Sequence, residues 1–137
     1  MSFTTPGQDF SPKDLTGTCH CGLVSYALET APKWYSECKC TLCIRYGVLW
    51  AYYPVETVHV RTKADSGLDT QTYTRKDGIL GMHFCPTCHN LIFWKGLDPN
   101  DPRVEGEMGV NVRLLPREVW EKNPNAEHRV TEGPEEP

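Results

Sequence analysis

The chain has 137 residues, which is enough for one domain of ordinary size and too few for two. Its formal net charge is −4, and it has no cluster of Lys and Arg of the kind that binds DNA or RNA, so we predict no nucleic-acid partner. It also has no apolar run near the roughly 20 residues of a membrane helix and no secretion signal in MSFTTPGQDFSPKDL. We therefore expect a cytoplasmic protein that does not bind a membrane.

The chain begins with a polar segment, residues 1–16, that contains Pro6, Gly7 and Pro12 and shows no period. We predict that it is a flexible N-terminal arm. From Gly17 onward, short apolar stretches are separated by turn residues, which predicts a mainly β domain over residues 17–120. The expected strands are 23–29, 34–40, 48–55, 55–60, 70–75, 79–85, 90–95 and 110–115.

The segment after the last expected strand begins with Pro116, which suits the first turn of a short helix over 116–120. Trp120 is expected to pack its ring on the domain. Residues 121–137 hold five Glu against Lys122 and Arg129 and few apolar residues, so we predict a flexible acidic tail.

Seven cysteines are present, an odd number, in tight clusters and without an export signal, which favours metal ligation over disulfides. Two outer pairs, C-x-C and C-x2-C, lie more than sixty residues apart and together make a set of four thiolates. Structural zinc sites take four such ligands in a tetrahedron. We predict a structural zinc that ties the first strand to a distant hairpin, held by Cys19, Cys21, Cys85 and Cys88.

The remaining three cysteines form the run C-x-C-x2-C and can surround one metal from a single tight loop: Cys38, Cys40 and Cys43. Catalytic zinc sites keep three protein ligands and leave one position for water or substrate. Two alternatives stay open: reactive thiols without a metal, or a fourth ligand that closes the site. The candidates for that ligand are His20, His59, His83, His89 and His128.

Three motifs in this order resemble those of the glutathione-dependent formaldehyde-activating enzyme family, also called the Gfa or CENP-V domain family. They are GTCHCGLVSY at 17–26, ECKCTLCIRYG at 37–47 and HFCPTCHN at 83–90, and they are joined by Leu97-Asp98 and Trp120. The resemblance implies the Mss4-like fold of the small zinc-binding guanine-nucleotide-release chaperones. It also implies that the four outer cysteines hold a structural zinc and the three central ones a catalytic zinc. Enzymes of this kind are carbon–sulfur lyases that act on the adduct of glutathione and formaldehyde.

Two positions depart from the family pattern. The family usually has Gly after the last C-x2-C, where this chain has His89, and that position commonly requires a positive φ. Ile44 and Arg45 stand where relatives often have a polar and a basic residue, which changes the expected lining of the pocket.

The leading hypothesis is a zinc-dependent carbon–sulfur lyase in which a thiol substrate occupies the open position on the second metal. Two zinc ions are expected per chain, with glutathione as co-substrate; the oligomeric state is not predicted. Arg45, nearest to the C-x-C-x2-C loop, is our first candidate for contact with the substrate carboxylates. Other basic candidates are Lys39, Arg61, Arg75 and Lys95, and aromatic candidates for the pocket wall or the core are Tyr46, Trp50, Tyr52 and Tyr53.

Two other functions compete with this hypothesis. One is a non-catalytic zinc module that binds another protein. The other is a methionine sulfoxide reductase, which is less favoured because its chemistry needs a redox-active cysteine without a metal.

Overall fold

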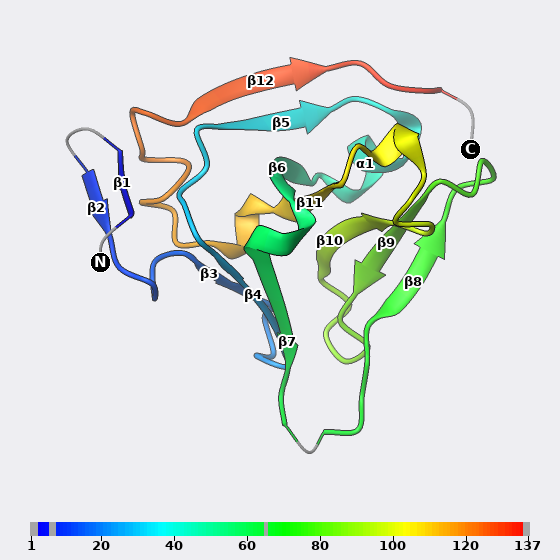
Figure 1. Ribbon diagram of the computed structural model, residues 1–137, viewed down its shortest axis with the longest axis horizontal. Coiled ribbons are helices and arrows are strands. Elements are labelled where there is room, and N and C mark those ends of the chain that lie inside the picture. Colours follow the sequence, from blue (N-terminus) through cyan, green and yellow to red (C-terminus); the bar gives the residue numbers. More distant parts are fainter. Residues whose placement is uncertain (1–2, 6–7, 65, 136–137) are drawn as a thin grey trace.

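The protein is described by a computed structural model that covers residues 3–5, 8–64 and 66–135, and it is mainly β, as predicted (Figure 1). Within these residues, seven strands form the main sheet, in the order β12 (Glu127–Thr131), β5 (Trp34–Cys38), β6 (Leu49–Pro54), β11 (Glu107–Asn111), β10 (Leu91–Gly96), β9 (Leu80–Phe84) and β8 (Gln71–Thr74). A second sheet has the order β3 (Thr16–Thr18), β4 (Val24–Leu28) and β7 (Val58–Thr62), and β1 (Phe3–Thr5) pairs with β2 (Gln8–Phe10). The helical segments are α1 (Thr41–Tyr46), η1 (Val55–Thr57), η2 (Pro102–Val104) and η3 (Val112–Leu114).

The central strands of the main sheet, β6, β11 and β10, are largely buried, and successive side chains of each strand point to opposite faces. On β6, Leu49, Ala51 and Tyr53 join the core that contains the β4 residues. Trp50 and Tyr52, which alternate with them, lie on the opposite face beside the C-x-C-x2-C loop. The alternation in LWAYYP therefore builds the core and the floor of the functional site from one strand.

The floor also contains Trp94 of β10, whose position depends on Gly109 in the neighbouring strand β11. A β-carbon at Gly109 would lie 2.0 Å from the indole nitrogen of Trp94, closer than real atoms approach. Only glycine leaves space for this indole over the strand.

Local differences from the predicted elements have simple causes. The predicted strand 55–60 begins with the turn η1, and the predicted strand 110–115 continues as η3 after Asn111. Residues 116–120 form turns and not a helix, although Trp120 is buried as predicted. The helix α1 was not predicted because six residues are too few to show an apolar period.

Of the predicted N-terminal arm, residues 1–16, the structure describes residues 3–5 and 8–16; residues 1, 2, 6 and 7 lie outside the described part. Its β1 and β2 form a hairpin, and Phe10 and Leu15 are buried in the core. The carbonyl of Leu15 accepts a hydrogen bond of 2.9 Å from the N–H of Leu28. Isolated apolar residues in a polar segment gave no periodic signal for this packing.

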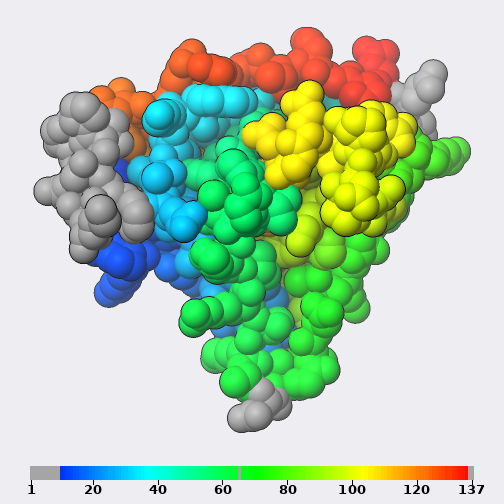
Figure 2. Space-filling model, viewed as in Figure 1, coloured from blue at the N-terminus to red at the C-terminus, as the bar shows by residue number. Residues whose placement is uncertain are grey.

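Part of the segment predicted to be a flexible tail, residues 121–137, forms the strand β12. This strand pairs in parallel with β5 at one edge of the main sheet. Figure 2 shows this segment in orange and red along the upper edge of the molecule, next to the cyan residues of β5. His128 stacks on Tyr35 at 5.1 Å between ring centroids, and the guanidinium of Arg129 lies 4.3 Å from the ring centroid of Trp34. The side chains of β12 are exposed and its pairing uses the backbone, so composition could not reveal the strand.

No helix in the described part of the chain is long and apolar enough to cross a membrane.

Candidate functional site

The structure brings together the four outer cysteines that were predicted to share a metal. Cys19 and Cys21 follow β3, while Cys85 and Cys88 lie in the turn between β9 and β10. All four sulfur atoms lie within 4.8 Å of one another. The Sγ atoms of Cys19 and Cys21 are 3.7 Å apart, and those of Cys21 and Cys85 are 3.6 Å apart. In a tetrahedral zinc site with bonds near 2.3 Å, neighbouring sulfurs are about 3.8 Å apart, so the donor set and its spacing fit such an ion.

The four thiols of the first cluster lie so close together that ionisation of one makes ionisation of its neighbours less favourable. A backbone hydrogen bond from Leu23 favours the Cys21 thiolate, but burial and the neighbouring thiols outweigh it and raise the pKa of Cys21 to about 11. Burial opposes ionisation of Cys88 too, yet hydrogen bonds from backbone N–H groups of Asn90 and Cys21 prevail and lower the pKa of Cys88 to about 6. A cation among the four sulfurs would remove this competition.

His89 occupies the position where the family pattern has glycine, and its φ is 63°. The sequence argument that this position requires a positive φ is therefore confirmed. The backbone N–H of His89 donates a hydrogen bond of 3.0 Å to the carbonyl of Cys85, which closes the turn. Because His89 has a side chain, its positive φ causes some backbone strain.

The second cluster comprises the three central cysteines. Cys38 ends β5, Cys40 is the N-cap of α1 and Cys43 lies within its first turn. Their sulfur atoms lie within 4.8 Å of one another. The N–H of Cys43 donates a hydrogen bond of 3.2 Å to the sulfur of Cys40. The first turn of α1 therefore brings the two residues together and gives the Cys40 sulfur a hydrogen-bond donor.

Two side chains outside the loop donate to this cluster. The indole Nε1 of Trp50 lies 3.4 Å from Sγ of Cys43, and Nη1 of Arg75 lies 3.5 Å from Sγ of Cys40. Burial raises the pKa of Cys43 far above its usual range. Burial also opposes ionisation of Cys40, but hydrogen bonds from Cys43 and its neighbours lower the pKa of Cys40 below its usual value.

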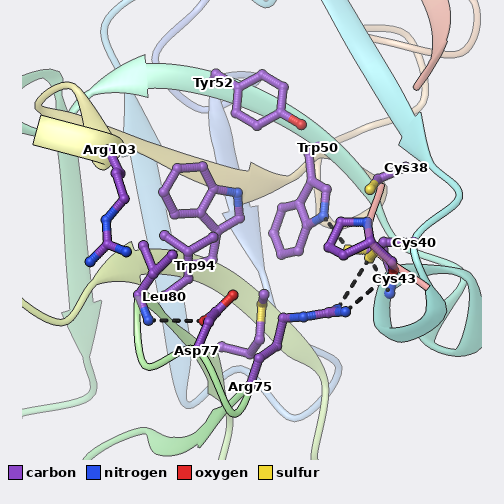
Figure 3. Close-up of a pocket in the computed structure, with 13 residues that line it drawn as sticks. Cys38, Cys40, Cys43, Trp50, Tyr52, Arg75, Asp77, Leu80, Trp94 and Arg103 are labelled. Atoms are coloured by element: carbon purple, nitrogen blue, oxygen red, sulfur yellow. Dashed lines mark hydrogen bonds between the residues drawn. The ribbon is translucent and has the colours of Figure 1, made fainter. Parts of the chain in front are cut away.

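A cavity of about 360 Å³ opens beside these three thiols. Its floor is apolar and aromatic, and Arg103 lies at the opposite end from the cysteines, with Trp94 between them (Figure 3). Burial raises the pKa of Tyr52 in this wall to about 12, which keeps its hydroxyl protonated at neutral pH. The residues that line the cavity are Cys38, Cys40, Cys43, Trp50, Tyr52, Arg75, Asp77, Ile79, Leu80, Met82, Trp94, Arg103 and Pro134.

The candidate substrate residue Arg45 lies elsewhere. Its guanidinium donates to the carbonyl of Thr41 at 2.6 Å and lines a different depression beside Tyr73. Of the other predicted basic residues, Arg75 lines the cavity. Arg103 was missed because it lies in η2, sixty residues after the C-x-C-x2-C run, and belongs to no motif.

The aromatic candidates also divide between the cavity and other parts of the fold, and no histidine candidate in the part of the chain that the structure describes joins the second cluster. Trp50 and Tyr52 line the cavity, whereas Tyr53 lies in the core and Tyr46 is exposed beside Phe84. In the described residues, the group around the three central cysteines contains no histidine, aspartate or glutamate. All seven cysteines are free thiols in the structure.

The fold and the two clusters define a β-rich protein with two groups of cysteines whose spacing could hold a metal ion, one of four thiols and one of three thiols beside a cavity. The model of the glutathione-dependent formaldehyde-activating enzyme family matches residues 14–130, and the chain belongs to this family. The resemblance seen in its motifs is thereby confirmed.

Among solved structures, the crystal structure of a Rhodobacter sphaeroides protein is similar, with a TM-score of 0.61 and 26% sequence identity. The similarity covers 85% of this chain and 99% of the other. No curated protein matches the chain.

Proposed function

We propose that the chain is a carbon–sulfur lyase that acts on the adduct of a thiol and a small aldehyde, with glutathione and formaldehyde as the first pair to test. Membership of the family supports this class of substrate. The observation that carries the proposal is the second cluster, in which three thiols border a cavity and the described residues supply no fourth ligand.

Zinc is our proposal for both ions. Cys19, Cys21, Cys85 and Cys88 would hold a structural ion, and Cys38, Cys40 and Cys43 would hold a catalytic ion with one position left for substrate. When bound there, zinc supplies the charge that keeps a coordinated thiol deprotonated, whereas a free thiol with a pKa near about 8.5 is only slightly ionised at neutral pH.

The reaction forms one bond between the substrate sulfur and the aldehyde carbon, and the thiol proton ends on the carbonyl oxygen. Cleavage of the adduct reverses both changes. We assign Trp50 and Trp94 to excluding water from the aldehyde, because both indoles border the cavity. Tyr52 keeps its proton at neutral pH, so its hydroxyl can donate a hydrogen bond to the carbonyl oxygen as charge develops on it.

The carboxylates of glutathione need cationic partners, and the cavity offers Arg103 at the end far from the thiols. A substrate whose sulfur lies at the cysteines would extend along Trp94 toward this guanidinium. Arg75 is closer to the thiols and already donates to Cys40. We therefore favour Arg103 over Arg45 as the residue that binds a substrate carboxylate.

The first experiment is a metal count by native mass spectrometry, with and without glutathione, followed by an assay of S-hydroxymethylglutathione. We expect two zinc ions, one retained glutathione, and activity that Cys40→Ser abolishes without unfolding the protein. A folded protein with two metals that neither binds glutathione nor converts the adduct would support the alternative, a non-catalytic module that binds another protein. Because the site needs reduced thiols, we expect the enzyme to work in the cytoplasm.

A further inference from the structure

The last residue of β12 and the three residues that follow it, 131–134, lie against the loop that carries the second cluster; we call this segment the C-terminal strap. The carbonyl of Thr131 accepts a hydrogen bond of 2.8 Å from the N–H of Lys39. The carbonyl of Pro134 accepts one of 3.1 Å from the N–H of Thr41. These donors flank Cys40, so the strap holds the backbone on both sides of a thiol of the cluster.

The strap approaches the cysteines as closely as a backbone can. A β-carbon at Gly133 would lie 2.6 Å from the Cβ of Cys40 and 3.3 Å from the sulfur of Cys38. The first distance is too short for two carbon atoms that are not bonded to each other. Glycine at 133 is therefore required by the space between the strap and these two cysteines.

The strap also borders the cavity. Pro134 is part of its wall, and the carbonyl of Pro134 accepts a hydrogen bond of 3.4 Å from Nη2 of Arg75. The same guanidinium donates through Nη1 to the sulfur of Cys40. At the start of the strap, the hydroxyls of Thr131 and Ser36 lie 2.9 Å apart and join it to β5.

The loop needs this support for a physical reason. A helix of six residues has little stability of its own, and Lys39 precedes it in irregular backbone. Without the strap, the N–H groups beside Cys40 would lose their partners and the separation of the sulfurs would no longer be fixed.

We propose that the C-terminal strap is a positioning element of the second metal site, which holds Cys38 and Cys40 in the geometry that binds the ion and forms one wall of the substrate cavity. The proposal rests on the proposed function for the existence of a second metal. The family match ends at residue 130, so it does not assign this role to residues 131–134.

The test is a pair of substitutions in the full chain, Gly133→Ala and Gly133→Val, with zinc affinity at each cluster measured by chelator competition. Partners that orient metal ligands typically contribute about 10- to 100-fold in affinity. We expect a loss in this range at the second cluster for Gly133→Val and a smaller loss for Gly133→Ala. Zinc affinity at the first cluster should not change, and neither should the melting temperature of protein whose second cluster holds no metal, because weaker binding lowers the melting temperature only when the second ion is present.

Glu135→Ala is the matched control, because this exposed residue lies just beyond the strap. Should Gly133→Val fail to fold, Thr131→Val removes the hydroxyl contact with Ser36 without adding bulk beside a cysteine, and it should weaken the second site in the same direction. Wild-type affinity at the second site in both Gly133→Ala and Thr131→Val would overturn the proposal.

The outcome separates this inference from the proposed function. Weakened binding of the second metal in the Gly133 variants, together with a wild-type protein that converts no thiol–aldehyde adduct, would support the strap and reject the lyase. Conversion of the adduct by the wild-type protein, together with unchanged metal affinity in the variants, would support the lyase and reject the strap. A wild-type protein that binds one metal would overturn both.

Discussion

The side-chain carbonyl of Asn90 accepts a hydrogen bond of 2.7 Å from the backbone N–H of His20. This contact joins the two turns that supply the first cluster, although the residues are seventy positions apart. We predict that Asn90→Ala lowers the free energy of unfolding of the metal-loaded protein by about 1–2 kcal/mol, the usual cost of losing such a partner. Chemical denaturation measures it, with the exposed Asn100→Ala as control; equal stability of the two variants would contradict the prediction.

The two clusters predict opposite effects of cysteine substitution. Cys88→Ser removes a ligand that connects distant parts of the chain, and we expect a fall in melting temperature of more than 10 °C, equivalent to a few kcal/mol. Cys43→Ser affects a cluster formed within one loop, so we expect the fold to persist and one metal to be lost. Calorimetry combined with a metal count tests both, and equal unfolding of the two variants would count against separate structural and catalytic sites.

His89 offers a stabilising substitution. With φ at 63°, it adopts a conformation that costs a residue with a side chain about 1 kcal/mol and glycine little. We predict that His89→Gly raises the free energy of unfolding by up to about 1 kcal/mol, with His89→Ala as the comparison that removes the ring but keeps the strain. A destabilised His89→Gly would mean that the imidazole makes a contribution larger than the strain.

Arg103 is predicted to determine preference for a carboxylated thiol. The side chain of Arg103 is exposed, although that of its partner Asp101 is only 13% exposed, so we expect Arg103→Ala to cost little stability. A hydrogen bond to a charged group contributes about 1.5–3 kcal/mol, so KM for the glutathione adduct should rise about tenfold or more. KM for the adduct of a thiol without carboxylates should stay the same.

The exposed Arg117→Ala is the control for that measurement. The same assay on Arg45→Ala decides between the two arginines, since a KM effect there and not at Arg103 would favour the residue that the sequence indicated.

Tyr52 gives a prediction about the chemical step. Because the pKa of Tyr52 is about 12, its hydroxyl is a donor throughout the neutral range, and Tyr52→Phe removes the donor with little change in shape. We expect kcat to fall about 100-fold, in the usual range for loss of such a group, with KM and metal content unchanged. A variant with wild-type kcat would exclude Tyr52 from the reaction.

The sequence was informative where chemistry is concentrated in short motifs. The spacing of the cysteines predicted both clusters, and strand-length apolar stretches such as residues 48–55 predicted the strands that position them. The positive φ of His89 followed from the departure from glycine. Each cysteine pair and each strand is a local signal, whereas the joining of the two outer pairs followed from the four ligands that zinc takes, and the positive φ at His89 followed from the family pattern.

The missed features depend on long-range packing. Arg103 and Trp94 reach the cavity from loops and strands whose position follows only from the order of the sheet. The strand β12 is held by backbone hydrogen bonds and aromatic contacts at its edge, and its acidic, proline-containing sequence resembles that of a flexible segment. Gly133 carries no sequence signal, because its requirement arises from the closeness of Cys40.

The pairing of β12 with β5 has a consequence for the order in which the sites mature during synthesis. The ligands of the first cluster are complete once residue 88 has left the ribosome, whereas the thiols of the second are made by residue 43 and wait for residues 131–134. At usual rates of translation the wait is on the order of ten seconds. The nascent chain therefore completes its four-thiol cluster first, and the cluster to which we assign the chemistry is the last to be assembled.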